Sequence, residues 1–188
     1  MTSCLLFRTT TRELPGLRVR RYQAHDWRSL FDLLSFLDGR YPGGLRWLDR
    51  RLQDVRDGRA RCIVAEFRGV IVGVAIETPK GLKRAKLSTL WVPPAWRGVG
   101  VGSRLLSTSV SLWLQAGLEE VWVTTRLALC DDLLPAMSLY GFEPIGLALD
   151  RYGPGGTELI LGWTPDQLPQ AKQSLSEELV QHRDHLLR

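Results

Sequence analysis

The segment "RGVGVG", Arg97 to Gly102, combines one arginine with three alternating glycines and follows an apolar run that ends in two prolines. Glycines leave consecutive backbone N–H groups open to a ligand, and a helix that starts there would point its positive end at the same place. Arg97 and Arg104 could add charge-assisted hydrogen bonds to an anion. The segment therefore predicts a phosphate-binding loop at a helix N-terminus.

Two common nucleotide-binding loops fit this segment poorly. A P-loop requires Gly-Lys-Ser/Thr, whereas Gly102 is followed by Ser103 and Arg104. The dinucleotide fingerprint requires a glycine where Ser103 stands, and an acidic residue at the end of the next strand. Glu119 and Glu120 precede the strand-like run "VWVTT" and would lie at its wrong end.

A third interpretation fits better. The form Arg-x-x-Gly-x-Gly after an "L-x-V-x-P" strand, with "YGF" downstream, resembles the acyl-CoA-binding loop of the GNAT superfamily of N-acetyltransferases. The resemblance covers residues 17–163. It implies an N-acyltransferase that moves an acetyl or other acyl group from acyl-CoA to a primary amine, by direct attack in a ternary complex. It also implies acetyl-CoA or another acyl-CoA as co-substrate, and no metal.

The resemblance also implies where the acyl-CoA lies. The strand "LSTLWV" would diverge from "EVWVTT", so that main-chain groups of the first strand pair with the pantetheine arm as an added strand does. The amine would enter from the other side, over the first two helices. The implied cofactor-binding residues are Leu90, Trp91, Val92, Arg97, Gly98, Val99, Gly100, Val101, Gly102 and Ser103.

The chain differs from the family pattern at the residue that protonates the leaving CoA thiolate. The family commonly has a tyrosine four residues before the glycine of Gly-Phe, and this chain has Met137, which we expect to pack in the core. Tyr140 and Ser138 are the local hydroxyl candidates, although Tyr140 also suits a core position. Cys130 stands where the family usually has asparagine, and we expect it to be inert.

An ammonium acceptor must also lose a proton before it attacks. Glu77, near the end of the third strand, is the first candidate for this general base, and Glu66 is the second. Either could instead be an ordinary surface residue of a strand. Ser88 and Thr89 could orient a water molecule.

The elements that must position these residues can be read from periodicity and from turn residues. Asp26 should cap a first helix that ends near Gly39, and Arg68 and Gly69 should form a hairpin turn. The order β, α, α, β, β, β, α, β, α, β, β, α predicts an α/β fold of the layered α+β kind, with a mixed, mostly antiparallel central sheet flanked by helices. The expected strands are 17–23, 61–67, 70–77, 85–92, 119–126 and two within 142–163, and the expected helices are 26–39, 45–58, 102–116 and 131–141.

Three segments are expected along the chain. Residues 1–16 should be a flexible N-terminal segment and residues 17–163 the acyltransferase-like domain. Thr164, Pro165 and Gln167 have the pattern of a helix start, which predicts a C-terminal helical extension over residues 164–188. Its leucine stripe could pack on the body or form a homodimer.

Composition excludes several classes of protein. With 188 residues, 44% hydrophobic and 24% charged, the chain is expected to be globular. No apolar run in the sequence reaches membrane-spanning length, and the N-terminal residues are not expected to be a signal peptide. The 3 cysteines lack disulfide or zinc spacing, so a cytoplasmic protein with reduced thiols and no membrane association is expected.

The net charge of +5 is concentrated in the first half and around the glycine loop, which suits an anionic ligand. Arginines of the second expected helix, with those of the first strand, could attract phosphates, or could be paired with nearby aspartates. We expect a small-molecule amine as the acceptor, with aminoacyl-tRNA as the alternative. A non-catalytic module that binds acyl-CoA or nucleic acid is the contrasting hypothesis. The arginines concerned are Arg46, Arg50, Arg51, Arg18, Arg20 and Arg21.

Overall fold

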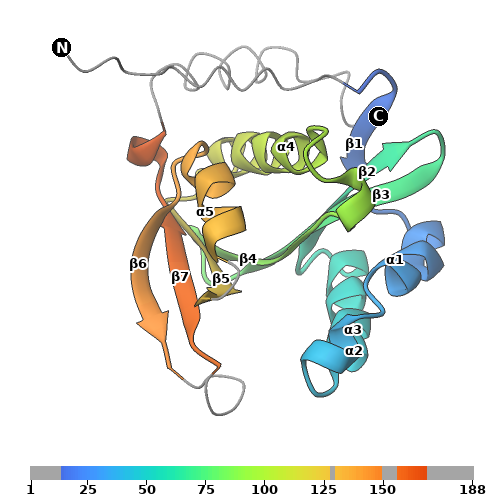
Figure 1. Cartoon of the computed structure of the whole chain (residues 1–188), viewed down its shortest axis with the longest axis horizontal. Coiled ribbons are helices and arrows are strands. Elements are labelled where there is room, and N and C mark those ends of the chain that lie inside the picture. Colours follow the sequence, from blue (N-terminus) through green and yellow to red (C-terminus); the bar gives the residue numbers. More distant parts are fainter. Residues whose placement is uncertain (1–13, 128–129, 150–155, 169–188) are drawn as a thin grey trace.

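The computed structural model describes residues 14–127, 130–149 and 156–168 (Figure 1). Most of the expected N-terminal segment and of the C-terminal extension, with its possible dimer contact, lies outside these residues. None of the helices in the described ranges is long and apolar enough to cross a membrane.

The strands of the described chain form one sheet in the order β1-β2-β3-β4-β5-β7-β6. Neighbouring strands are antiparallel except β4 and β5, which run parallel. The predicted mixed, mostly antiparallel sheet is therefore confirmed. The strands are β1 (Leu17–Arg21), β2 (Arg61–Phe67), β3 (Val70–Pro79), β4 (Arg84–Trp91), β5 (Glu120–Arg126), β6 (Glu143–Ala148) and β7 (Glu158–Trp163).

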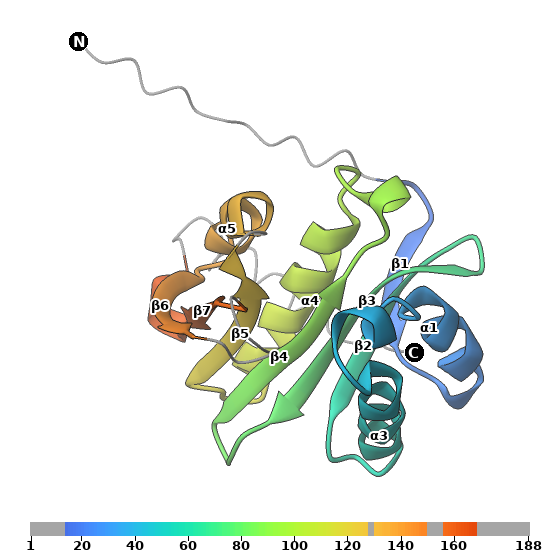
Figure 2. The same cartoon turned by 60° about the horizontal axis from the view of Figure 1, so that its bottom comes forward.

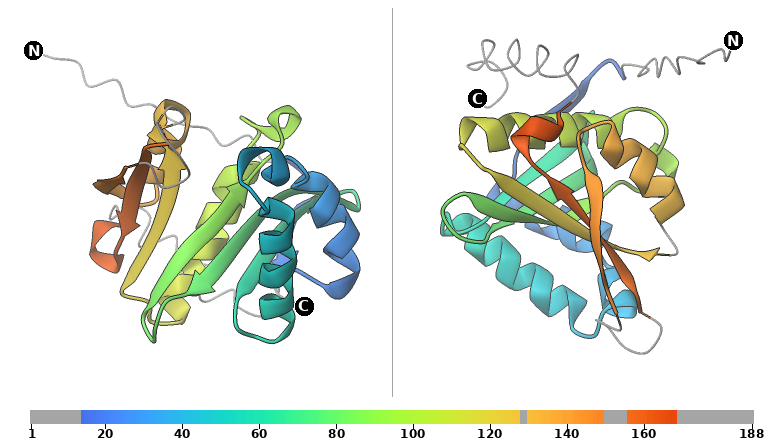
Figure 3. Two further views of the ribbon diagram at one scale, coloured as in Figure 1. Left: turned by 90° about the horizontal axis from the view of Figure 1, so that it is seen from below. Right: turned by 90° about the vertical axis from the view of Figure 1, so that its left-hand side faces the viewer.

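Helices cover both faces of the sheet, with a different set on each face (Figures 2 and 3). Helices α4 (Val101–Gln115) and α5 (Cys130–Ser138) lie on one face, and α1 (Trp27–Leu33), α2 (Leu37–Arg40) and α3 (Gly44–Arg56) lie on the other. Each face has its own hydrophobic core. The α4 core is built around Trp113, Phe142 and Trp163, and the core under α1–α3 around leucines such as Leu30 and Leu48.

The first predicted helix is corrected by the structure. It is divided into a 3-10 turn (Ala24–Asp26), α1 and α2. The Asp26 carboxylate does not cap α1, because it accepts hydrogen bonds from the Arg20 guanidinium at 2.7 and 2.9 Å and from the Gln23 N–H at 2.8 Å. Leu30 and Leu34, in and after α1, are both fully buried.

One predicted turn is confirmed in full and one predicted helix start only in part. The β2–β3 hairpin turns at Arg68 and Gly69, which have φ of 50° and 80°, as a tight hairpin turn requires. The capping box at Thr164 is present, but the turn it begins is a 3-10 helix (Pro165–Gln167), after which Leu168 is extended and buried. The helix predicted to continue from there is therefore not found up to Leu168.

Candidate functional site

Strands β4 and β5 are paired only at their beginnings. Their register joins Arg84 to Glu120, Ala85 to Val121 and Lys86 to Trp122. Beyond this, β4 continues along β3 while β5 follows β7 to its end at Arg126. The two parallel strands thus form a fork, from Leu87 to Trp91 on β4 and from Val123 to Arg126 on β5, which opens towards their C-terminal ends (Figure 3).

Ion pairs hold the narrow end of the fork. Lys83 bonds to Glu119, and Arg84 lies 2.8 Å from Glu120. Much of the basic charge that precedes the glycine loop in the sequence is therefore neutralised at the end of β4 that is remote from the loop.

A β-bulge lies where the fork begins. Ile76 pairs with Thr89 but Glu77 pairs with Leu87, so β4 has one extra residue, Ser88. An extra residue exchanges the faces of every side chain after it. Leu87 before the bulge and Leu90 after it both contact the α4 core, whereas Trp91 packs on the α1–α3 side.

The glycine loop lies at the wide end of the fork, between β4 and α4. Gly98 and Gly100 have φ of 73° and 90°, which only glycine adopts readily. The first backbone hydrogen bond of α4 runs from the Arg104 N–H to the Gly100 carbonyl. Helix geometry therefore leaves the N–H groups of residues 101–103 without an intrahelical partner. A methyl group added at Gly102 would meet only Val92, at 3.8 Å.

The Arg97 side chain contacts both Val92 and Trp91. The Arg97 Nε donates to the Val92 carbonyl at 3.0 Å, and its guanidinium lies over the Trp91 ring, 5.0 Å from the centroid. The Val92 carbonyl thus accepts one hydrogen bond from within the chain, and its predicted contact with the cofactor stays a prediction. The edge of β4 at Leu90 and Trp91 that faces β5 has no strand partner in the described chain.

The end of α5 carries the expected hydroxyls. Met137 is 0% exposed, so its predicted packing role is confirmed. The Tyr140 hydroxyl donates to the Ser103 carbonyl in the first turn of α4 at 3.0 Å, and burial raises the pKa of this phenol. Ser138 is exposed. The Cys130 side chain lies outside the described part of the structure.

The two carboxylates predicted as general bases lie elsewhere than expected: Glu77 is beside the start of the fork but on the α4 face of the sheet, and Glu66 is on β2. Glu77 is 7% exposed and accepts a hydrogen bond from the Trp113 indole of α4, with Arg61 at 3.5 Å. It faces α4 and not the side from which the amine was expected to enter, which corrects its assignment. Burial raises its pKa against the opposing effects of Arg61 and Trp113. Glu66 is paired with Arg20 at 2.8 Å.

Ser88 and Thr89 remain as polar residues at the start of the fork. The Ser88 hydroxyl is 2.9 Å from that of Thr78, and either can be the donor. Thr78 is adjacent to Glu77 on β3, so it faces the opposite side of the sheet, towards α1–α3.

Helix α2 links the two sides of the fork at its wide end. Phe36, before α2, packs on Trp91 with ring centroids 4.1 Å apart, and the Arg40 guanidinium lies over both rings. On the other side, Arg126 donates to the Arg40 carbonyl at 3.2 Å and lies over the Tyr41 ring. Sequence periodicity gave no signal for this contact, because it depends on which distant segments meet.

Glu158, the first residue of β7, was also missed. It is 2% exposed, and its Oε2 has no hydrogen-bond partner among the described residues. Its cross-strand neighbour on β5 is Arg126. The one available signal was an acidic residue beginning the otherwise apolar run "ELILGW".

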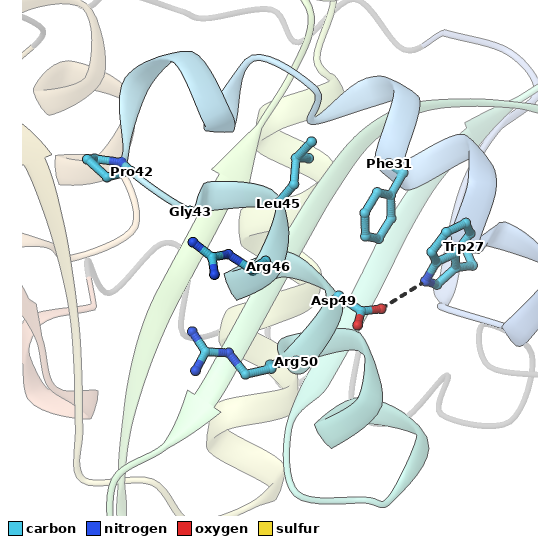
Figure 4. Close-up of a pocket in the computed structure, with 8 residues that line it drawn as sticks. All are labelled: Trp27, Phe31, Pro42, Gly43, Leu45, Arg46, Asp49 and Arg50. Carbon is cyan, nitrogen blue, oxygen red and sulfur yellow. Dashed lines mark hydrogen bonds between the residues drawn. The ribbon is translucent and has the colours of Figure 1, made fainter.

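A surface pocket of about 790 Å³ lies between α1 and α3, apart from the fork (Figure 4). Trp27 stacks on Phe31 at 4.2 Å along one wall, and Arg46 and Arg50 form the other. These arginines have no carboxylate partner in the described ranges, whereas Arg51 pairs with Asp54 at 2.8 Å. The lining is completed by Pro42, Gly43, Leu45 and Asp49. No group of three metal-ligating side chains occurs in the part of the chain that the structure describes.

Comparison with known proteins agrees with this geometry. The model of the acetyltransferase (GNAT) family matches residues 22–141, more than half of the 188 residues. The fold is similar to that of an N-acetyltransferase from Staphylococcus aureus Mu50, with a TM-score of 0.68, 12% identity, and coverage of 79% of this chain and 98% of that chain. No curated protein matches the chain in sequence.

Two further solved structures share the fold. A ribosomal-protein-alanine N-acetyltransferase from Brucella melitensis has a TM-score of 0.66 and 19% identity, over 78% of this chain and 98% of that chain. A GNAT family acetyltransferase from Elizabethkingia anophelis, with acetyl-CoA bound, has a TM-score of 0.64 and 13% identity, over 80% of this chain and 99% of that chain.

Proposed function

Because this chain belongs to the acetyltransferase (GNAT) family and is an acyltransferase, we propose that it moves an acetyl group from acetyl-CoA to a primary amine of a small molecule. The observation that carries the proposal is the β4–β5 fork, which opens onto the glycine loop at the start of α4. The family uses acetyl-CoA, and the relative from Elizabethkingia anophelis has it bound.

The residues present at the fork fit acetyl-CoA. The N–H groups of residues 101–103 and the positive end of α4 would hold the pyrophosphate, with Arg104, which is exposed on the first turn, adding charge. The β4 edge at Leu90 and Trp91 would pair with the pantetheine arm. When bound, acetyl-CoA supplies a thioester, which is an activated acyl group.

The remaining residues would position the amine and handle protons. In the transfer, the amine nitrogen bonds to the acyl carbon and the carbon–sulfur bond breaks. The leaving thiolate then needs a proton, or departs as the anion. Tyr140 holds its proton at neutral pH as any tyrosine does, burial raises its pKa further, and its hydroxyl is anchored at the first turn of α4. Tyr140, Ser138 or water would supply this proton.

The first experiment is calorimetric titration with acetyl-CoA, with NADH and ATP as controls. Amine-dependent release of CoA thiol is then measured with spermidine, ethanolamine, phenethylamine and a peptide that begins with alanine. We expect acetyl-CoA alone to bind and at least one amine to be acetylated. Tight binding without turnover across the amines would instead support a non-catalytic acyl-CoA-binding module.

A variant tests the placement of the pyrophosphate. Gly102→Ala should not lower the melting temperature, because the added methyl group meets only Val92 at 3.8 Å and alanine is favoured over glycine in a helix. It should weaken acetyl-CoA binding by about tenfold, since the methyl group would lie among the amides that hold the phosphates. Gln115→Ala, at the other end of α4, is the control. Wild-type binding by Gly102→Ala would contradict the placement.

A second candidate acceptor, aminoacyl-tRNA, is favoured by the pocket between α1 and α3. A stacked aromatic pair in which Trp27 is exposed, beside two arginines without carboxylate partners among the described residues, is suited to a nucleobase and a phosphate. Affinity for tRNA should then fall steeply as salt is raised, and fall further in Arg46→Gln with Arg50→Gln. A flat salt dependence would exclude this acceptor.

A further inference from the structure

Glu158 combines burial with an unused acceptor atom. The residue is 2% exposed, yet its Oε2 has no hydrogen-bond partner among the described residues. Leaving a carboxylate oxygen buried and unpaired is costly, so such groups are rare in folded proteins. A bound group that donates a hydrogen bond to this oxygen would remove the cost.

The position of Glu158 relates this oxygen to the fork. On β7, Leu159, Leu161 and Trp163 pack in the α4 core. Because side chains alternate along a strand, Glu158 faces the other side, on which α1–α3 lie. Its neighbour Arg126 confirms this, since residues directly opposite in an antiparallel pair share a face and Arg126 donates to the Arg40 carbonyl of α2.

No described basic side chain pairs with that oxygen. Arg126 is the nearest candidate by register, but its guanidinium bonds to the Arg40 carbonyl and lies over the Tyr41 ring, 5.6 Å from the centroid. The other carboxylates considered for proton transfer are engaged elsewhere. Glu77 faces α4, and Glu66 is paired with Arg20.

We propose that Glu158 is the general base that takes a proton from the ammonium form of the acceptor amine, at the wide end of the fork between β7 and α2. The proposal rests on the acyl transfer proposed above. The ammonium donates one proton to Oε2, and the neutral amine then forms the bond to the acyl carbon as the carbon–sulfur bond breaks. The second proton of the nitrogen passes to the thiolate by way of Tyr140, Ser138 or water, and Glu158 returns its proton to solvent.

The test compares two nucleophiles in Glu158→Gln. An alkylamine from the panel above, such as spermidine or ethanolamine, is protonated at neutral pH and needs a base. Hydroxylamine is largely unprotonated there and does not. We expect kcat/KM for the alkylamine to fall by about a hundredfold or more, as is typical for loss of a general base. With hydroxylamine the loss should stay below about tenfold.

Matched measurements separate the possible failures. Acetyl-CoA binding by Glu158→Gln should equal that of the wild type, and Glu143→Gln, an exposed carboxylate on β6, should change neither rate. Equal losses with both nucleophiles, or no loss with either, would overturn the role of Glu158 while leaving the transferase intact. If Glu158→Gln does not fold, Glu158→Asp carries the same comparison, and equal losses again overturn the role. A wild type that acetylates no amine would instead remove the proposed function itself.

Discussion

Glu77 and Trp113 show how a buried carboxylate can be structural. The indole N–H of α4 donates to the carboxylate, and Arg61 at 3.5 Å gives it a partial counter-charge. Burial still raises the pKa of Glu77, which means that the folded protein holds the charged form less readily than water does. The contacts of Glu77 therefore join β3 to α4, which accounts for this residue as a structural one without a role in proton transfer.

Glu77→Gln tests this assignment. Glutamine keeps an oxygen for the Trp113 N–H and removes the buried charge. At a pH above the raised pKa, the free energy of unfolding of Glu77→Gln should equal or exceed that of the wild type. The difference should disappear as the pH falls and Glu77 becomes protonated. Acetyl transfer should stay within about threefold of the wild type, whereas loss of a general base costs about a hundredfold or more.

Tyr140→Phe separates positioning from acid catalysis. Loss of the hydrogen bond to the Ser103 carbonyl should lower the free energy of unfolding by about 1 kcal/mol. Turnover should fall by less than about tenfold, because a thiolate leaves readily and water can protonate it. Chemical denaturation and steady-state kinetics measure both, with Ser138→Ala, at an exposed position, as the comparison. A large kinetic loss at unchanged stability would make Tyr140 the essential acid.

At the scale of elements, Gly141 ties the end of α5 to the turn after β7. It has φ of 83°, and a Cβ there would lie 2.8 Å from the Gln167 carbonyl oxygen. Gly117, at the end of α4, also has positive φ, 63°, but an added Cβ would meet nothing within 4 Å. Substituting Gly117 therefore causes only the backbone strain of a positive φ, whereas substituting Gly141 adds a steric clash with the Gln167 backbone.

Alanine at these two positions should have different costs. Gly117→Ala should lose about 1 kcal/mol of unfolding free energy, the cost of a left-handed alanine. Gly141→Ala should lose about 3 kcal/mol or more, because the Gln167 backbone must also move. Urea unfolding gives both values. Equal losses would show that the turn at residues 165–168 is not held against Gly141.

What the sequence reveals of these elements depends on how local each signal is. The glycine loop could be predicted because its residues are consecutive and because its backbone conformation depends on these residues themselves, not on distant segments. The extra residue at Ser88 could not, because a bulge is defined by register with β3. The unpaired oxygen of Glu158 depends likewise on Arg126 bonding to Arg40 instead, which no local pattern encodes.

At the scale of the whole molecule, a charged network fastens the first strand to both the sheet and the helical layer. Arg20 of β1 bonds to Asp26 in the turn before α1 and to Glu66 on β2. Burial alone would raise the pKa of Asp26, but the hydrogen bonds from Arg20 and from the Gln23 N–H outweigh it, so the pKa lies below its ordinary value. The charged form of Asp26 thus stabilises the fold.

The direction of that shift fixes how stability depends on pH. A carboxyl whose pKa is lowered by folding contributes its full stabilisation above its unfolded pKa, about 3.9, and loses it as the pH falls through the folded value. Asp26→Asn should therefore be less stable than the wild type at neutral pH, by about 2 kcal/mol for lost bonds to a charged group. The two proteins should converge as the solution is acidified below about pH 3.9. Urea unfolding across this pH range measures the difference. The control is Glu119→Gln, at the exposed pair with Lys83, which should change the free energy of unfolding by less than about 1 kcal/mol. A gap that persists unchanged into acid would mean that the Asp26 side chain stabilises the β1–α1 junction by packing, and that its charge contributes nothing.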